Sequence, residues 1–167
     1  MIEFTTEHIV QFQILGAVLL SLFLGGLIGL EREIVGKPAG LRTHMLVAGA
    51  TTLIVDLGDV AINLFTVETA STLVSADPLR IIEAVVAGIS FLGAGTILRR
   101  GQRSQVEGLT TAASILFTAA VGISVALSQF VVAVGATMIA LFILRLIQIS
   151  ENYFDRYPGS KGEQELE

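Results

Sequence analysis

The stretch Phe12–Leu30 reads FQILGAVLLSLFLGGLIGL, and it contains no charged side chain. A helix needs roughly 20 apolar residues to cross a hydrocarbon core about 30 Å thick, so this run is long enough to span a membrane. Four further apolar stretches follow it: Leu41–Leu64, Leu79–Leu98, Leu109–Leu127 and Phe130–Ile149. The pattern predicts an all-α integral membrane protein, with a bundle of five transmembrane helices over residues 1–150 and a short polar tail over 151–167.

The basic residues predict which way this bundle faces. Short loops rich in Lys and Arg stay in the cytoplasm. Nine of the ten bases lie around the start of the second stretch, between the third and fourth, or toward the end of the chain, and the tenth is Arg80. The N-terminus carries only the acids Glu3 and Glu7 before the first stretch. We therefore expect the N-terminus outside, the C-terminus in the cytoplasm, and a multi-pass protein in the inner (plasma) membrane, in contact with the lipid bilayer.

Composition argues against several function classes. The 167 residues leave nothing over for a soluble catalytic domain beside the helices, and there is no cysteine to form disulfides or thiolate metal sites. No long basic stripe indicates nucleic acid. Phosphate-binding loops and nucleophile elbows are missing, and we expect no His beside a serine at membrane depth. The sequence therefore predicts that the protein is not an enzyme and has no certain cofactor.

Small residues recur every fourth position in the first stretch. They are Ala17, Ser21, Gly25 and Gly29. This spacing stacks them on one face of a helix, where they let another helix approach closely. Helix packing is the main interpretation and pore lining the minor one. The stripe is compatible with self-association or with packing inside one chain.

Ionisable residues at membrane depth are candidates for function. Asp56 and Asp59 lie one turn apart in the second stretch, and Arg80 and Glu83 lie near the outer start of the third. The main interpretation is an ion-pair network in which Arg80 fixes one helix against the other. Alternatively Asp56, Asp59 and Glu83 bind a metal such as Mg²⁺, which prefers hard oxygen ligands. A third interpretation is that these side chains reach the membrane surface.

A second charged group is expected at the cytoplasmic face. Its members flank the second and fourth stretches: Glu31, Arg32, Glu33, Lys37, Arg42, His44, Arg99, Arg100, Arg103 and Glu107. One interpretation is a positive-inside charge belt with local salt bridges. The other is a docking surface for a partner protein, or the inner gate of a pathway. On this view His44 is an ordinary histidine of the membrane interface.

Three motifs resemble the MgtC/SapB family of membrane proteins. The first runs from Gly29 to Val47 and includes Glu31, Arg32, Gly40, Arg42 and Thr43. The second runs from Arg80 to Ile97 and includes Gly93 and Gly95, and the third is Gly108–Ser114 with Thr110. The resemblance covers roughly Gly16 to Arg145, and it implies a membrane domain of five helices.

The resemblance also implies a function. The family is associated with adaptation to low magnesium and with survival of bacterial pathogens in host cells, and a regulatory role on other membrane complexes, such as the F-type ATP synthase, is favoured. Virulence-associated members carry Asn, Glu and Cys at the positions of Thr110, Arg100 and Phe117, which favours a short, housekeeping-like branch without the soluble C-terminal domain. We therefore expect an accessory or regulator of magnesium homeostasis that acts through a membrane partner. The alternative is a passive or secondary divalent-cation transporter that uses the acidic cluster.

Overall fold

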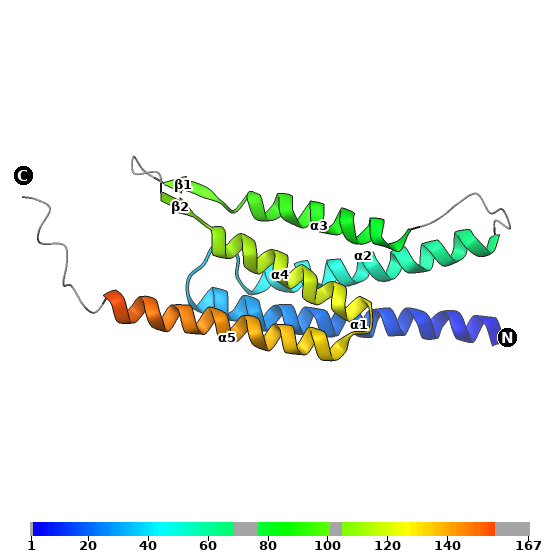
Figure 1. The fold of residues 1–167 in the computed structure, drawn as a ribbon. Coiled ribbons are helices and arrows are strands. Elements are labelled where there is room, and N and C mark those ends of the chain that lie inside the picture. The colour runs from blue at the N-terminus through cyan, green and yellow to red at the C-terminus, as the bar shows by residue number, and fades with distance from the viewer. Residues whose placement is uncertain (1, 69–76, 101–104, 156–167) are drawn as a thin grey trace, which may run out of the picture.

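The computed structural model describes residues 2–68, 77–100 and 105–155, and it contains five helices in this part of the chain. Figure 1 shows the helices lying side by side along one long axis, with the start of α1 at one end and the end of α5 at the other. Their bounds are α1 Ile2–Ile34, α2 Leu41–Glu68, α3 Pro78–Ala94, α4 Leu109–Ala126 and α5 Phe130–Asp155. The predicted helical architecture is present, and its last helix extends into the segment expected to be a polar tail.

Three of these helices are long and apolar enough to cross a membrane. The qualifying segments are His8–Ile34, Leu41–Leu64 and Leu109–Ala126, and α5 adds a shorter apolar segment, Phe130–Leu146. The third helix has 17 residues, which corresponds to about 25 Å at 1.5 Å per residue. The chain thus has the apolar helices of a membrane protein, although fewer meet this length than the five expected.

The centre of the bundle is formed by α1, α2 and α4. The first helix packs mainly against α2, and α4 packs against α2 and α1, while α5 covers α1 and α4. The third helix lies at the side, against α4 and α2 (Figure 1). Buried apolar side chains from these helices, including Ile28, Ile115, Val121 and Val125, form the core. Outward-facing Phe and Leu side chains remain exposed, as expected for helices surrounded by lipid.

Local sequence determines where the helices start and stop. The N–H of Gly36 donates to the Glu33 carbonyl at 3.0 Å, and that of Lys37 donates to the Arg32 carbonyl at 3.0 Å. This is a Schellman motif with Gly36 in the left-handed region at φ 70°, so α1 ends here. The third helix begins where Asp77 accepts a hydrogen bond from the N–H of Leu79, with Pro78 in the first turn.

The expected third segment, Leu79–Leu98, is too long at its C-terminal end. The helix stops at Ala94 because Gly95 and Thr96 turn the chain, and the Thr96 hydroxyl donates to the Gly93 carbonyl at 2.7 Å. A short antiparallel hairpin follows, made of β1 (Leu98–Arg100) and β2 (Gln105–Glu107), with Leu98 opposite Glu107. The all-α prediction did not include this hairpin. It ends at Gly108, which has φ 95° and precedes α4.

Candidate functional site

A buried ion pair lies at the C-terminal end of α1. The Arg32 Nε donates to Glu31 Oε2 at 2.5 Å, and the two side chains are 3% and 5% exposed. Sequence reasoning placed both residues in a charged belt with local salt bridges, and the structure contains this salt bridge, which packing of α1 against α2 encloses. The other oxygen of Glu31, Oε1, is buried without a hydrogen-bond partner among the described residues. Removing one partner of a buried ion pair typically costs about 3–5 kcal/mol of stability, so replacing either residue alone is expected to destabilise the fold.

The fully buried His44 connects α2 to α4. Its Nδ1 lies 2.9 Å from the Gly40 carbonyl oxygen and its Nε2 lies 3.1 Å from Ser114 Oγ. Because a carbonyl can only accept, Nδ1 carries a proton and donates it to Gly40. The Ser114 hydroxyl also lies 2.8 Å from the Thr111 carbonyl. The expectation that no His lies beside a serine at membrane depth was therefore wrong. Both side chains are buried, so the pair links two helices.

The backbones of α1 and α4 both approach α2 closely around the buried Ala48. A Cβ atom added at Gly25 would lie 2.6 Å from the His44 carbonyl oxygen, and one added at Gly122 would lie 2.6 Å from the Ala48 carbonyl oxygen. The Thr52 hydroxyl crosses between the helices and donates to the Gly122 carbonyl at 2.9 Å. The helices are therefore in direct backbone contact at the middle of the bundle.

The small-residue stripe of the first helix faces this contact. Ser21, Gly25 and Gly29 are buried, and Ala17 is half-buried. A Cβ atom at Gly29 would lie 2.8 Å from the Gly40 carbonyl oxygen, at the start of α2. The two glycines of the stripe thus pack against α2 within the chain, whereas Ala17 packs against the apolar cluster that includes Val121 and Val125.

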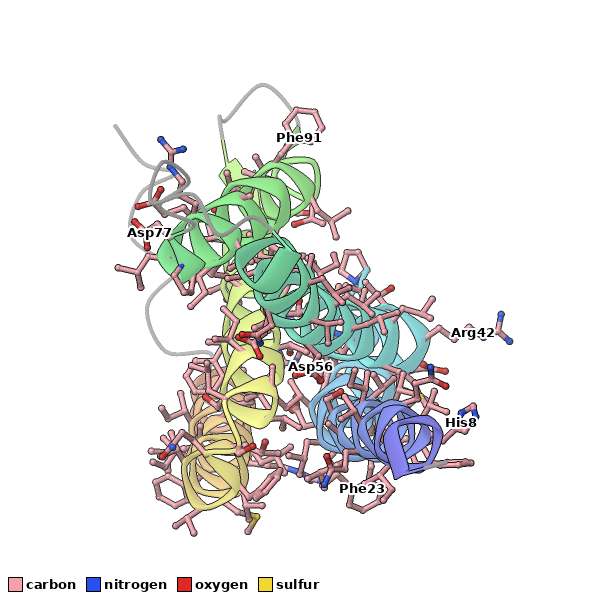
Figure 2. The ribbon with its side chains drawn as sticks, turned by 90° about the vertical axis from the view of Figure 1, so that its right-hand side faces the viewer. His8, Phe23, Arg42, Asp56, Asp77 and Phe91 are labelled. Atoms are coloured by element: carbon pink, nitrogen blue, oxygen red, sulfur yellow. The ribbon has the colours of Figure 1, made fainter. Side chains whose placement is uncertain are left out.

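The connection between α1 and α2 is held by a carboxylate. Oε2 of Glu33 accepts a hydrogen bond from the N–H of Leu41 at 2.8 Å, so it caps the first turn of α2. A Cβ atom at Gly40 would lie 2.8 Å from the same oxygen, so a larger residue at this position would have to displace the Glu33 side chain. Thr43 is half-buried in the same turn, whereas Arg42 is exposed and points away from the bundle (Figure 2).

Two cavities meet at the acidic pair Asp56 and Asp59. One of about 580 Å³ lies between α1, α2 and the α4–α5 turn, and another of about 270 Å³ lies between α2, α3 and the same turn. Both are lined by Ala126 and Ser128 as well as by the two acids. Oδ2 of Asp56 is buried and has no hydrogen-bond partner in the described part of the chain. Figure 2 shows Asp56 pointing inward between the helices.

The other two members of the predicted network lie elsewhere. Glu83 is exposed and lines neither cavity. Arg80 is also exposed, and within residues 2–68, 77–100 and 105–155 it forms no ion pair with Asp56, Asp59 or Glu83. In these same ranges no three His, Asp or Glu side chains are grouped so that they could hold a metal ion. The structure thus brings Asp56 and Asp59 together and leaves Arg80 and Glu83 apart from them.

The remaining motif residues surround the hairpin. Gly93 packs against α4, where an added Cβ would lie 3.5 Å from the Ala112 Cβ, and Gly95 caps α3. Thr110 is exposed in the first turn of α4, and Arg99 belongs to β1. Arg103 lies outside the described residues. These glycines place the hairpin at the same end of the molecule as the Glu31–Arg32 pair.

The sequence of this chain is similar to that of several known proteins. Residues 18–153 match the model of the MgtC family. Protein MgtC of Salmonella typhimurium is 36% identical over 161 residues, which cover 95% of this chain and 63% of that protein. The putative magnesium transporter YhiD of Escherichia coli is 36% identical over 142 residues, 85% of this chain and 61% of that protein. An uncharacterized protein of Haemophilus influenzae is 34% identical over 153 residues, with coverages of 92% and 62%.

The chain therefore spans about three fifths of the length of these curated relatives. No solved structure shows a significant match to it.

Proposed function

We propose, from the premise that this chain belongs to the MgtC family, that it supports magnesium homeostasis as an accessory or regulatory membrane protein that acts through a membrane partner. Its long apolar helices support a place in the bilayer. The link to magnesium is supported by similarity to a protein named as a putative magnesium transporter. A regulator needs no ion pathway through its own bundle.

The close helix contact around Ala48 is the observation that carries this proposal. Magnesium is small, demands octahedral oxygen ligands and usually keeps several waters, so a pathway for it has to be wide and polar. At Gly25 and Gly122 the helix backbones are too close to accommodate even one added methyl group, at 2.6 Å from the neighbouring carbonyl oxygens. Buried hydroxyls at this level, such as that of Thr52, donate to backbone carbonyls and tie the helices together.

We place the protein in the inner membrane with its N-terminus outside. The basic segments before α2 and between α3 and α4 support this orientation. Figure 1 shows the α1–α2 connection and the hairpin beside the start of α4, and the α4–α5 turn at the opposite end of that helix. The basic and the uncharged connections are thus separated along the long axis, as the positive-inside rule requires.

Cation transport is the second candidate function, and one observation favours it. Asp56 has an unpartnered oxygen beside a cavity of about 580 Å³ that also exposes Asp59. A carboxylate at membrane depth is a candidate for an ion or proton pathway. Asp56 and Asp59 supply two carboxylate ligands, and magnesium would have to complete its octahedral coordination with water.

Magnesium flux into proteoliposomes separates the two functions. The purified chain would be reconstituted beside two variants, Asp56→Asn and Glu83→Gln, the second being an exposed control that lines neither acidic cavity. The regulator proposal predicts no saturable flux for any of the three proteins. In a strain lacking the gene, it predicts slow growth at low magnesium that the wild-type chain restores.

Each result has a clear meaning. Saturable flux that Asp56→Asn loses and Glu83→Gln keeps would overturn the regulator proposal and establish a cation pathway. Restored growth without flux from a folded, correctly inserted protein supports regulation through a partner. Normal growth of the deletion strain at low magnesium would contradict both functions.

A further inference from the structure

The hydroxyl group of Ser114 has two neighbours that compete for its single hydrogen. Its Oγ lies 2.8 Å from the Thr111 carbonyl oxygen, which can only accept, and 3.1 Å from Nε2 of His44. The other ring nitrogen, Nδ1, lies 2.9 Å from the Gly40 carbonyl oxygen and therefore carries a proton. The direction of the Ser114 hydroxyl and the protonation of Nε2 are thus linked.

Both protonation states of the His44 ring fit this arrangement. In the neutral ring, Nε2 accepts a hydrogen bond from the Ser114 hydroxyl, and the Thr111 carbonyl keeps its hydrogen bond within α4. In the cationic ring, Nε2 donates to Ser114 Oγ, and the hydroxyl turns to donate to the Thr111 carbonyl. The change requires the rotation of one hydroxyl hydrogen and leaves the heavy atoms in place. A histidine that only links two helices needs just one of these states.

Charged side chains of α1 act on this ring. Among the described residues, Glu31 and Arg32 are the charged groups that interact electrostatically with His44, while Arg42, on α2 itself, points away from the bundle (Figure 2). Burial of the ring and the positive Arg32 oppose a charge on it, whereas the negative Glu31 favours one. Glu31 is 5% exposed, and its Oε1 has no hydrogen-bond partner in the described part of the chain. A buried carboxylate oxygen is therefore left over near the ring.

The ring is buried, but it lies close to an exposed connection. His44 belongs to the first turn of α2, and Glu31 lies little more than one turn before the exposed Gly36 and Lys37. A proton from the aqueous phase at this end of the molecule therefore has only the last turn of α1 and the first turn of α2 to pass. In the proposed orientation this phase is the cytoplasm.

We propose that His44 is a reversible proton-binding site, in which Ser114 Oγ accepts the second ring proton and Glu31 compensates the charge. Histidine is the side chain whose charge ordinarily changes between pH 5 and 8, and ionisable residues at membrane depth mark proton sites. The proton is taken from the adjacent aqueous phase and returned to it. Because a charge-assisted hydrogen bond is stronger than a neutral one, proton uptake tightens the link between α2 and α4. The inference does not depend on the proposed regulatory function.

The chain suits a spectroscopic test because it contains two histidines, His8 and His44. The full chain, labelled with nitrogen-15 in its histidines, would be placed in lipid nanodiscs and followed by NMR from about pH 8 to about pH 5, where histidine titrates. The two nitrogens of a neutral ring have widely different chemical shifts, and those of a cationic ring have similar ones. The exposed His8 is the internal control, and His8→Gln assigns the signals. We expect His44 to change from a neutral ring to a cation while the protein stays folded.

Two serine variants of α4 decide whether the hydroxyl belongs to the site. Ser114→Ala removes the acceptor of the Nε2 proton, whereas Ser124→Ala removes a hydroxyl that donates to the Ala120 carbonyl of the same helix. We expect Ser114→Ala to move the His44 titration by about one pH unit toward acid, or about tenfold in proton affinity, because the cation loses the stronger bond. Ser124→Ala should leave the titration unchanged. Glu31→Gln removes the negative charge and should move the titration in the same direction as Ser114→Ala.

A His44 ring that stays neutral throughout this range in the folded protein would overturn the proposal and leave the residue as a link between helices only. Equal titrations of the two serine variants would also overturn it, because the Ser114 hydroxyl would then take no part. Neither result touches the regulatory function, which growth at low magnesium and flux test separately.

Discussion

Single glycines set how closely the helices of this bundle approach one another. Gly25 and Gly122 each lie where an added Cβ atom would come within 2.6 Å of a backbone carbonyl oxygen of α2. Gly135 is also in a helix, but a Cβ atom there would meet nothing within 4 Å. Glycine therefore has different physical roles at these positions, and an alanine substitution separates them.

We expect Gly122→Ala to destabilise the protein and Gly135→Ala to leave it unchanged or stabilise it. In the first variant the methyl group forces α4 away from the Ala48 carbonyl, at a cost of about 1–3 kcal/mol. In the second, alanine favours the helical backbone by up to about 1 kcal/mol. Unfolding in mixed detergent micelles, followed by circular dichroism, measures the difference. Equal stabilities of the two variants would contradict the close contact.

Sequence spacing predicted contacts within one helix better than contacts between helices. The stripe from Ala17 to Gly29 was recognisable because its members repeat every four residues on one face. The hydrogen bond between His44 and Ser114 joins residues 70 positions apart, and no spacing inside either helix reveals it. For the same reason Arg80 and Glu83 were wrongly joined to Asp56, since depth in the membrane says nothing about which faces meet.

At the scale of elements, the connection between α1 and α2 depends on one exposed side chain. Glu33 accepts the hydrogen bond from the N–H of Leu41 and so places a negative charge at the start of α2. We expect Glu33→Ala to destabilise the protein by about 0.5–2 kcal/mol, as loss of a cap does. Lys37→Ala, in the same exposed connection, is the control. Unfolding midpoints of the two variants would be compared, and a loss no larger for Glu33 than for Lys37 would refute the cap.

Helix starts were more predictable than helix ends. The second, fourth and fifth helices begin at Leu41, Leu109 and Phe130, the residues at which the apolar stretches begin. The third ends four residues early, because Gly95 and Thr96 bend the chain into the hairpin. Hydropathy cannot detect this turn, since Ile97 and Leu98 are as apolar as the helix before them.

At the scale of the whole molecule, the connections are separated along the long axis. This separation predicts an orientation in the membrane that can be tested. The α1–α2 connection, beside the start of α4, contains the exposed Lys37, and the turn at the other end of α4 contains the exposed Gln129 (Figure 1). The positive-inside rule puts Lys37 in the cytoplasm and Gln129 outside. Because the chain has no cysteine, a single introduced thiol reports its own side of the membrane.

We expect a membrane-impermeant maleimide added to intact cells to label Gln129→Cys and not Lys37→Cys. Both positions are exposed, so a difference in labelling reflects the membrane and not burial within the protein. Disruption of the cells should make Lys37→Cys as reactive as Gln129→Cys, which controls for its chemistry. The opposite labelling would invert the orientation and put the acidic cavities at the cytoplasmic end.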